Sequence, residues 1–152
     1  TPTSSVFTLG TGPAGNNTNY GYIAYIFSEV PNYSKFGSYT GNGDADGTFV
    51  YTGFKPAFVM AKRSNSASSA DWNIRDDKRS PINVASQVLQ ANLSAAEGTA
   101  SGTLIDIYSN GFKPRSSGSG VNAGSSLYIY MAFAENPFVT STGNGSIPAT
   151  AR

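Results

Sequence analysis

Two stretches of the chain carry nearly the same strand pattern, "YIAYIFSE" at residues 22–29 and "YIYMAFAE" at residues 128–135. In both, large apolar side chains recur at alternate positions, and each stretch ends in an acid, Glu29 or Glu135. Successive side chains of a β-strand point to opposite faces of the sheet, so this pattern predicts strands with one face in a core. Any fold assigned to the chain must therefore find a place for the same strand twice.

The similarity continues on both sides of the two strands. Phe7 and Phe112 each precede a loop rich in Gly, Ser and Asn that leads into the tyrosine strand, and an identical Thr-Gly-Asn-Gly follows both strands. Tyr22 lies 106 residues before Tyr128, and Phe7 lies 105 residues before Phe112. We interpret this as a tandem repeat of whole domains, because solenoid repeats are only ~20–50 residues long.

The phase of the repeat predicts the domain organisation. Residues 1–30 should be the terminal strands of a preceding tandem unit, residues 31–138 a complete β-sandwich unit, and residues 139–152 a C-terminal tail. We therefore expect the chain to be a piece of a longer protein, or to be processed from one. An isolated hairpin is marginally stable in water, so residues 1–30 should pack on residues 36–137 or on a neighbouring chain.

Composition predicts the fold class. Charged residues make up 12% of the chain, about half the usual ~25%, whereas Gly, Tyr and Phe are abundant. We expect an all-β fold, an antiparallel jelly-roll-like β-sandwich with long Gly/Ser/Asn loops and at most one short helical turn. The candidate strands are residues 6–9, 20–29, 37–40, 48–52, 57–63, 70–75, 103–108, 111–114 and 127–134.

The segment 80–98 is the only one that tolerates a helix. Ser94 and Glu97 have the spacing of a capping box, but Gly98 follows at once, so at best one helical turn is expected. The loops at 64–69 and 116–126 consist mostly of small polar residues. We expect both loops to lie solvated at the ends of the sandwich.

The chain contains no Cys and no His. This excludes a Ser-His-Asp relay, a thiolate nucleophile and zinc or copper sites built from these residues. The net charge of +1 is too small for a nucleic-acid-binding surface, and no apolar run approaches the ~20 residues of a membrane helix. We therefore expect a protein that is not an enzyme and that binds neither nucleic acid nor membrane.

The sequence "NGDADG" at residues 42–47 matches the start of a calcium loop. Asn42, Asp44 and Asp46 have the alternate spacing of calcium ligands, although the Glu that an EF-hand needs at its twelfth position is replaced by Gly53. The alternative is a hairpin turn in which Asn-Gly supplies a positive φ. No cofactor other than this possible calcium ion is expected.

Trp72 is the only tryptophan and lies among polar residues. On a regular strand Trp72 shares one face with Ile74, and Asp71, Asn73 and Arg75 share the other. An aromatic ring near fixed polar groups is typical of sugar-binding sites, which makes Trp72, Asp71, Asn73 and Arg75 candidate ligand-binding residues. The alternative is a core tryptophan flanked by residues that face solvent.

Asp106 is the one acid within an apolar stretch, "LIDIY". On a regular strand it shares a face with Leu104 and Tyr108. We expect a buried acid whose hydrogen bonds stabilise the fold, with catalysis as the alternative.

Several blocks of the sequence resemble a domain of unknown function that recurs in structural proteins of tailed phages, especially marine and cyanobacterial phages. The similarity spans residues 3–138 and includes "GFKPAFVMAKR", "NLSAAEGT", "SNGFKPRSS" and "YIYMAFAENPF". The chain departs from this family at Ile26, where a Cys is frequent. The resemblance implies a tail, fibre or other virion-associated protein, in which the domain commonly follows a jelly-roll-like lectin-type module. It provides no catalytic motif.

These observations lead to three functional expectations. The first is a non-enzymatic structural protein on the exterior of a phage virion, a tail fibre or a capsid decoration or head-fibre protein, with host attachment as a further role. It would assemble with other copies of itself, preferably as a closed trimer, and with other virion proteins. The second is a carbohydrate-binding adhesin module that binds a host-surface glycan. The third is a self-assembling extracellular filament in which residues 1–30 complete a neighbour's sheet.

The two copies also predict where recognition would occur. Their strands agree but their loops differ, and loops vary while strands maintain the frame. We expect any host contact to involve loops 10–19, 42–47, 64–72 and 116–126. The tyrosine faces of 20–29 and 127–134 should be packed inside the domain or against another subunit.

Overall fold

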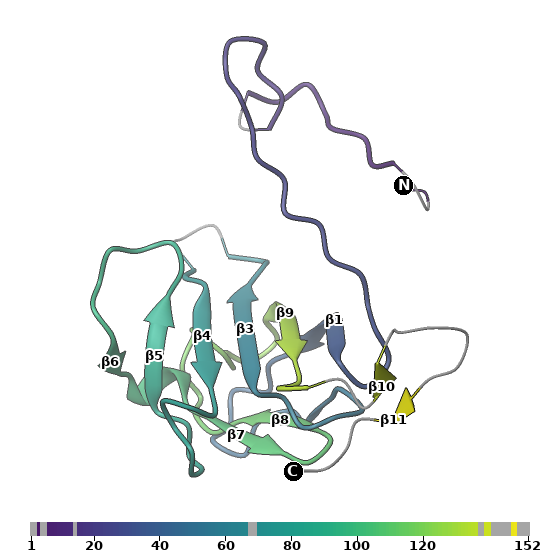
Figure 1. The fold of residues 1–152 in the computed structure, drawn as a ribbon. Coiled ribbons are helices and arrows are strands. Elements are labelled where there is room, and N and C mark those ends of the chain that lie inside the picture. Colours follow the sequence, from purple (N-terminus) through teal and green to yellow (C-terminus); the bar gives the residue numbers. More distant parts are fainter. Residues whose placement is uncertain are drawn as a thin grey trace.

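A computed structural model describes residue 3, residues 6–13, 15–66 and 70–136, and the backbone of residues 139–140 and 147–148. The predicted fold class is confirmed, because the described chain is an antiparallel β-sandwich with a single short helical turn (Figure 1). The elements are β1 (Ser34–Thr40), β2 (Val50–Tyr51), β3 (Phe58–Arg63), β4 (Asn73–Asp76), β5 (Gln87–Gln90), β6 (Gly98–Thr99), the 3-10 helix η1 (Ser101–Thr103), β7 (Ile105–Tyr108), β8 (Gly111–Pro114), β9 (Leu127–Phe133), β10 (Val139–Thr140) and β11 (Ile147–Pro148).

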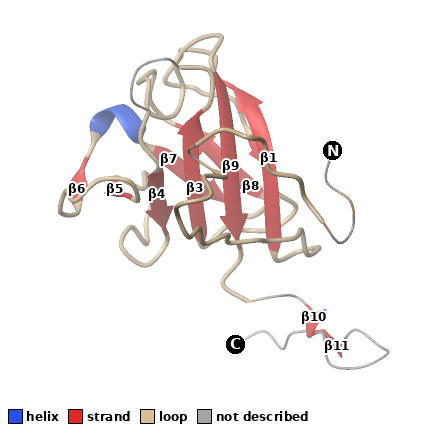
Figure 2. Cartoon of the chain, turned by 90° about the horizontal axis from the view of Figure 1, so that it is seen from above, coloured by secondary structure: helices blue, strands red, loops and turns tan. Residues whose placement is uncertain are grey.

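Two sheets form the body of the domain. The larger sheet has the strand order β1-β9-β3-β4-β5-β6, and the smaller has the order β2-β8-β7. In Figure 2 the smaller sheet lies behind β3, β9 and β1, and side chains of both sheets meet in one buried cluster. β3 is a central strand of the larger sheet and lies between β9 and β4.

Aromatic rings fill the centre of this cluster. Tyr39 of β1 stacks on Tyr128 of β9 with 5.1 Å between the ring centroids, and Phe112 of β8 lies edge-on to Tyr130 at 5.4 Å. Tyr128, Tyr130 and the other inward residue of β9 are buried, whereas the alternate residues of β9 are more exposed. The alternation predicted for the second tyrosine strand is therefore confirmed.

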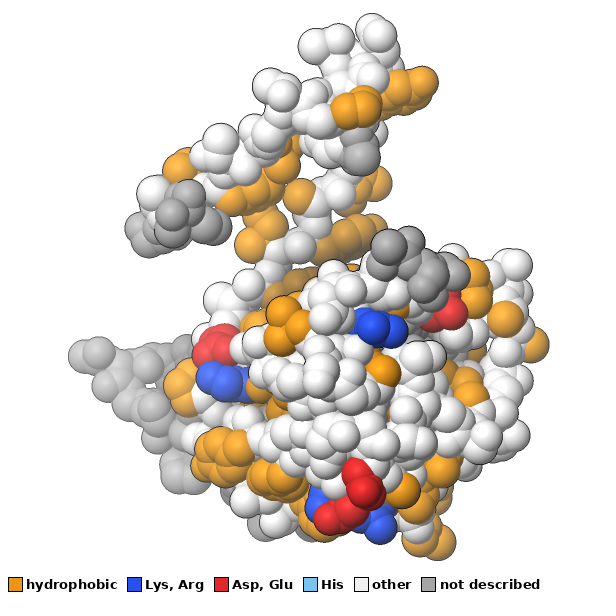
Figure 3. Space-filling model, turned by 180° about the vertical axis from the view of Figure 1, so that it is seen from behind, with side chains coloured by type: hydrophobic (Ala, Val, Ile, Leu, Met, Phe, Trp, Pro, Cys, Tyr) orange, Lys and Arg blue, Asp and Glu red, His pale blue; other side chains and the backbone are white. Residues whose placement is uncertain are grey.

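The first tyrosine strand is not part of either sheet. The predicted strands 6–9 and 20–29 are wrong for this chain, because residues 6–13 and 15–29, here called the arm, contain no strand. The arm projects away from the sandwich (Figures 1 and 3), and pairing begins only with a bridge between Val30 and Ser34. The physical reason is that β9 already fills the position between β1 and β3. Pairing of the arm with a neighbouring chain stays a prediction.

Residues 80–98 form no helical turn, which agrees with the expectation of at most one turn there. This segment contains β5 and the first residue of β6, and the short helix η1 follows it. Val88 of β5 is buried, so tertiary packing against the core decides the conformation over weak local preference. Ser94 and Glu97 lie in the connection between β5 and β6 and cap no helix.

Candidate functional sites

Strand β4 separates the predicted ligand-binding residues onto two faces. Asn73 and Arg75 are buried on the face towards the smaller sheet, whereas Trp72 is half-buried on the opposite face, with the Lys62 ammonium 5.6 Å from its ring centroid. The predicted alternation is confirmed. The structure brings Asp71 and Asn73 together and places Trp72 outside their site.

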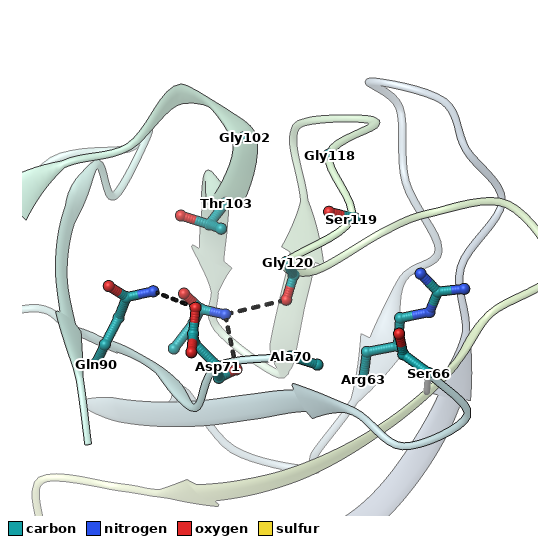
Figure 4. A pocket seen from close by; sticks show the side chains of 11 residues that line it. Arg63, Ser66, Ala70, Asp71, Gln90, Gly102, Thr103, Gly118, Ser119 and Gly120 are labelled. Atoms are coloured by element: carbon teal, nitrogen blue, oxygen red, sulfur yellow. Dashed lines mark hydrogen bonds between the residues drawn. The ribbon is translucent and has the colours of Figure 1, made fainter. Parts of the chain in front are cut away.

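Asp71 and Asn73 line a polar pocket of about 350 Å³ (Figure 4). The Asp71 carboxylate accepts hydrogen bonds from Gln90 Nε2 at 3.0 Å and Asn92 Nδ2 at 2.9 Å, which fix its orientation. Asn73 Nδ2 donates to the carbonyls of Asp71 and Gly120. Gly102 and Thr103 of η1 also line the pocket, and its other lining residues lie at strand ends or in loops: Arg63, Ser66, Ala70, Gln90, Gly118, Ser119 and Gly120.

One buried polar atom of this pocket has no hydrogen-bond partner among the described residues. Asn73 is only 4% exposed, yet its Oδ1 accepts no hydrogen bond from the described part of the protein. A buried amide oxygen without a donor costs about 1–3 kcal/mol, so a bound hydroxyl or amide would be stabilised there. The pocket therefore combines the Asp71 carboxylate with a second acceptor, Asn73 Oδ1, which is buried and lacks a donor.

Arg75 supports the pocket from behind and does not line it. It is 1% exposed and donates to the Ile74 carbonyl and to the carbonyl and hydroxyl of Thr103, which does line the pocket. Desolvation, with a smaller effect from the nearby charge of Arg79, lowers the pKa of Arg75 to about 10. No described acidic side chain forms an ion pair with it. Strand periodicity alone could not distinguish this supporting role from direct contact.

The possible calcium loop is held by its own hydrogen bonds and by cations. Asn42 Oδ1 accepts from the Asp44 N–H, and Asp44 Oδ1 accepts from the Asp46 N–H. The Asp46 carboxylate lies 2.6 Å from Lys113 Nζ and 2.7 Å from an Arg115 nitrogen; the Lys113 hydrogen bond is the main reason its pKa is lowered. No three acidic side chains among the described residues are grouped to hold a metal ion, and calcium binding stays a prediction.

The hairpin-turn alternative for residues 42–47 is wrong in one respect. The loop leaves β1 in the larger sheet and leads to β2 in the smaller sheet, so it does not connect paired strands. The positive φ expected at the Asn-Gly step is present, since Gly43 has φ 74°.

The loop 116–126, expected to be solvated, is partly buried. Val121 is 2% exposed and Asn122 is fully buried. Asn122 Nδ2 donates to Asn42 Oδ1 at 2.8 Å and to the Asp44 carbonyl at 2.6 Å, and its Oδ1 accepts from the Asn42 N–H. Two loops that were expected to carry any host contact are thus joined to each other, because the side chain of Asn122 in one loop hydrogen-bonds to backbone groups of Asn42 and Asp44 in the other.

The arm contains a turn that duplicates this loop. The Tyr128 hydroxyl donates to the carbonyl nine residues before it at 2.7 Å and accepts from the N–H five residues before it at 2.8 Å. The Tyr22 hydroxyl makes the same two bonds at 2.7 and 3.0 Å. Three backbone hydrogen bonds of the arm also recur in the loop at a shift of 106 residues. In the arm the N–H groups of Gly15 and Asn16 donate to the Gly12 carbonyl, and Tyr20 donates to Asn17. In the loop Val121 and Asn122 donate to Gly118, and Ser126 donates to Ala123. The repeat found in the sequence is therefore also a repeat of structure.

The arm exposes most of its apolar side chains. In Figure 3 hydrophobic side chains lie along the arm, while the visible face of the body is mostly polar and uncharged. The large hydrophobic residues of the arm are 46–82% exposed; they are Val6, Phe7, Leu9, Tyr20, Tyr22, Ile23, Tyr25, Ile26 and Phe27. Only Phe27 packs on aromatic rings of the body, with its centroid 6.1 Å from Phe36 and 5.8 Å from Phe133.

Phe36 and Phe133 belong to the face of the larger sheet that points away from the core, here called the outer face. Strand pairing aligns Phe36, Met131, Met60 and Ile74 in one row across β1, β9, β3 and β4. All four are half-buried, and they alternate along their strands with residues on the core side. The outer face is thus a sheet face with an apolar centre.

Asp106 of β7 has the contacts of a structural acid. Its Oδ2 lies 3.3 Å from Arg115 Nε and accepts a hydrogen bond from Tyr108, with which it was expected to share a face. Its side chain is 13% exposed.

No helix in the described part of the chain is long and apolar enough to cross a membrane.

Comparison with known proteins gives one match. A family model described as a domain of unknown function (DUF7483) matches residues 1–137, so a single match includes both the arm and the sandwich. Searches among curated proteins and among solved structures found no match.

Proposed function

The chain belongs to the DUF7483 family of domains of unknown function, and we propose that it is a non-enzymatic structural subunit that assembles with other copies of itself on the exterior of a virion. The observation that carries the proposal is the apolar arm, whose side chains have few partners within the described chain. The absence of Cys and His from the sequence is consistent with a role without catalysis.

Magnitudes favour association through the arm. Full burial of one large apolar side chain contributes roughly 1.5–3 kcal/mol, so the nine exposed residues of the arm could contribute on the order of 14–27 kcal/mol as an upper bound. The loss of translational and rotational freedom on association costs about 4–15 kcal/mol, and the ordering of interface side chains adds to this cost. Burial of the arm against another copy can therefore stabilise a complex, whereas an arm left in water contributes no free energy of burial. Soluble monomers rarely expose so much contiguous apolar surface.

The virion setting is supported by the resemblance to structural proteins of tailed phages and by the sparse surface charge. A closed trimer is the preferred state, because each arm finds a partner and none remains free when the symmetry closes. If the rotation between neighbours does not close, the same contact produces an open filament. Light scattering distinguishes these two outcomes by the mass of the complex.

The test is the mass of the intact chain in solution, measured by light scattering after size-exclusion chromatography at micromolar concentration. We expect a trimer for the unmodified chain and a monomer for the double variant Tyr25→Ser, Ile26→Ser. Both residues are more than 70% exposed, so their replacement should not disturb the fold. The control variant Ile82→Ser, Leu93→Ser changes two exposed apolar residues outside the arm and should remain trimeric. A monomeric unmodified chain would contradict the proposal.

A second function is favoured by the polar pocket. We propose that the pocket binds the hydroxyl groups of a host-surface saccharide through Asn73 Oδ1 and the Asp71 carboxylate. A glycan array should give hits that are lost in Asp71→Ala and retained in Trp72→Ala, because Trp72 lies on the other face of the sheet. An array without hits would leave the protein as a purely structural module.

A further inference from the structure

We propose that the arm of one copy lies across the outer face of the larger sheet of a second copy. This inference rests on the proposed function, because it specifies the contact through which copies assemble. The surface it identifies is centred on Met60, Ile74 and Ile129, and the segment that covers it is residues 20–27 of the partner.

The outer face has the composition of a covered surface. An antiparallel sheet with one face in water alternates apolar residues inside with polar residues outside. Here the row across four strands is Phe36, Met131, Met60 and Ile74, and Ile129 next to it is 38% exposed. In the adjacent row Lys62 is paired with Ile129, and its ammonium lies 5.6 Å from the Trp72 ring centroid, so a charged group borders the apolar row on this side.

The arm has the complementary pattern. As an extended segment it places Ile23, Tyr25 and Phe27 on one side, and the corresponding outer residues of β9 are Ile129, Met131 and Phe133, so the two sets share Ile and Phe at their ends. Phe27 shows how such a side chain fits, since it already stacks on Phe36 of its own copy. Tyr25 and Ile23 leave the body and are 81% and 82% exposed. Each copy therefore covers one end of its own outer face and leaves the rest open.

Other positions in a second copy are less suitable for the arm. The arm repeats the sequence of β9, but it cannot take the position of β9 in a second copy. There β9 itself pairs along its whole length with β1 and over six residues with β3. The free edge of β1 is partly closed as well. The Phe36 N–H donates to Glu29, and the Thr40 carbonyl accepts from the Thr48 hydroxyl. The outer face is the remaining apolar surface next to β9.

The test uses disulfide cross-linking, since the chain has no Cys of its own. One intact chain carries Tyr25→Cys, and a second, differently tagged chain carries Met60→Cys or, independently, Ile129→Cys. A disulfide forms only when the two Cα atoms approach within about 7 Å, so it reports direct docking. The control partner carries Tyr51→Cys, a residue that is 64% exposed on the smaller sheet.

After mixing and mild oxidation, we expect at least tenfold more heterodimer with Met60→Cys or Ile129→Cys than with Tyr51→Cys. Because the two cysteines are on separate chains, folding of an arm onto its own sheet gives no product and would overturn the inference. If arm-dependent association persists but cross-links do not favour the outer face, the inference fails and the proposed function stands. If the unmodified chain is monomeric, both the inference and the proposed function fail. The arm would then need a partner domain in which the position of β9 is empty.

Discussion

Replacing Tyr128 by Phe should lower the free energy of unfolding by about 2 kcal/mol. The ring is fully buried and stacks on Tyr39, and Phe retains these contacts. The hydroxyl group donates to the Ser119 carbonyl at 2.7 Å and accepts from the Ala123 N–H at 2.8 Å. Each hydrogen bond contributes about 1 kcal/mol net, so loss of the two gives the stated magnitude.

The arm contains a matched control. Tyr22 makes the same two hydrogen bonds, but it is 46% exposed and its turn lies outside the sandwich. Tyr22→Phe therefore removes the same atom from the same local structure without touching the core. We expect it to change the free energy of global unfolding by less than about 0.5 kcal/mol, as surface substitutions generally do.

Both variants are measured by urea denaturation, with far-ultraviolet circular dichroism and the fluorescence of Trp72 as independent probes. Tyr128→Phe should lower the midpoint with an unchanged slope, and should lower the melting temperature by about 4–8 °C for a chain of this size. The assignment of the turn before β9 to the cooperative core would be refuted if both variants lowered the free energy of unfolding equally. It would also be refuted if Tyr128→Phe did not lower it.

Three further predictions follow from single positions. Gly111→Ala should destabilise by about 3 kcal/mol in thermal unfolding, because its Cβ would lie 2.2 Å from a backbone carbonyl of β2; Gly98→Ala, with open space around it, should be neutral. Burial alone would raise the pKa of Asp76, but hydrogen bonds from the backbone and guanidinium of Arg79 outweigh it and lower the pKa. Asp76→Asn should thus lose about 1 kcal/mol at neutral pH, and the difference from the unmodified chain should vanish as the pH falls through the lowered pKa. Tyr130→Asp should prevent folding, seen as loss of the cooperative transition, because Tyr130 is only 7% exposed and a buried unpaired carboxylate costs several kcal/mol.

Three strands were predictable from the sequence almost to the residue. β8 has the predicted bounds, and β3 and β9 each differ from prediction by one residue. These strands carry β-branched and aromatic residues at positions that pack in the core, so local preference and tertiary structure agree. β5 was missed because "QVLQ" has only two apolar residues, and its conformation depends on pairing with β4.

The candidate site was predictable as a set of residues on one face, but its composition was not. Alternation along β4 correctly separated Trp72 from Asn73 and Arg75. It could not show that Asp71 is oriented by Gln90, in a strand that sequence analysis missed, and by Asn92, in the turn after that strand. It also could not show that Asn122 joins two loops, because the bonds between Asn122 and Asn42 connect residues 80 positions apart. Long-range polar contacts of this kind leave no periodic signal.

The first tyrosine strand shows what a periodic pattern specifies. Residues 22–29 have the alternation of β9, and the turn before them forms the same hydrogen bonds as the turn before β9. They remain outside the sheets because β9 occupies the one position between β1 and β3. Alternation therefore shows that a segment can cover an apolar surface, but it does not show which surface. That depends on which positions in the sheets are already filled by other strands. The sheet position is filled in its own domain, and the apolar outer face is only partly covered. Residues 22–29 therefore have a physical reason to bind another molecule.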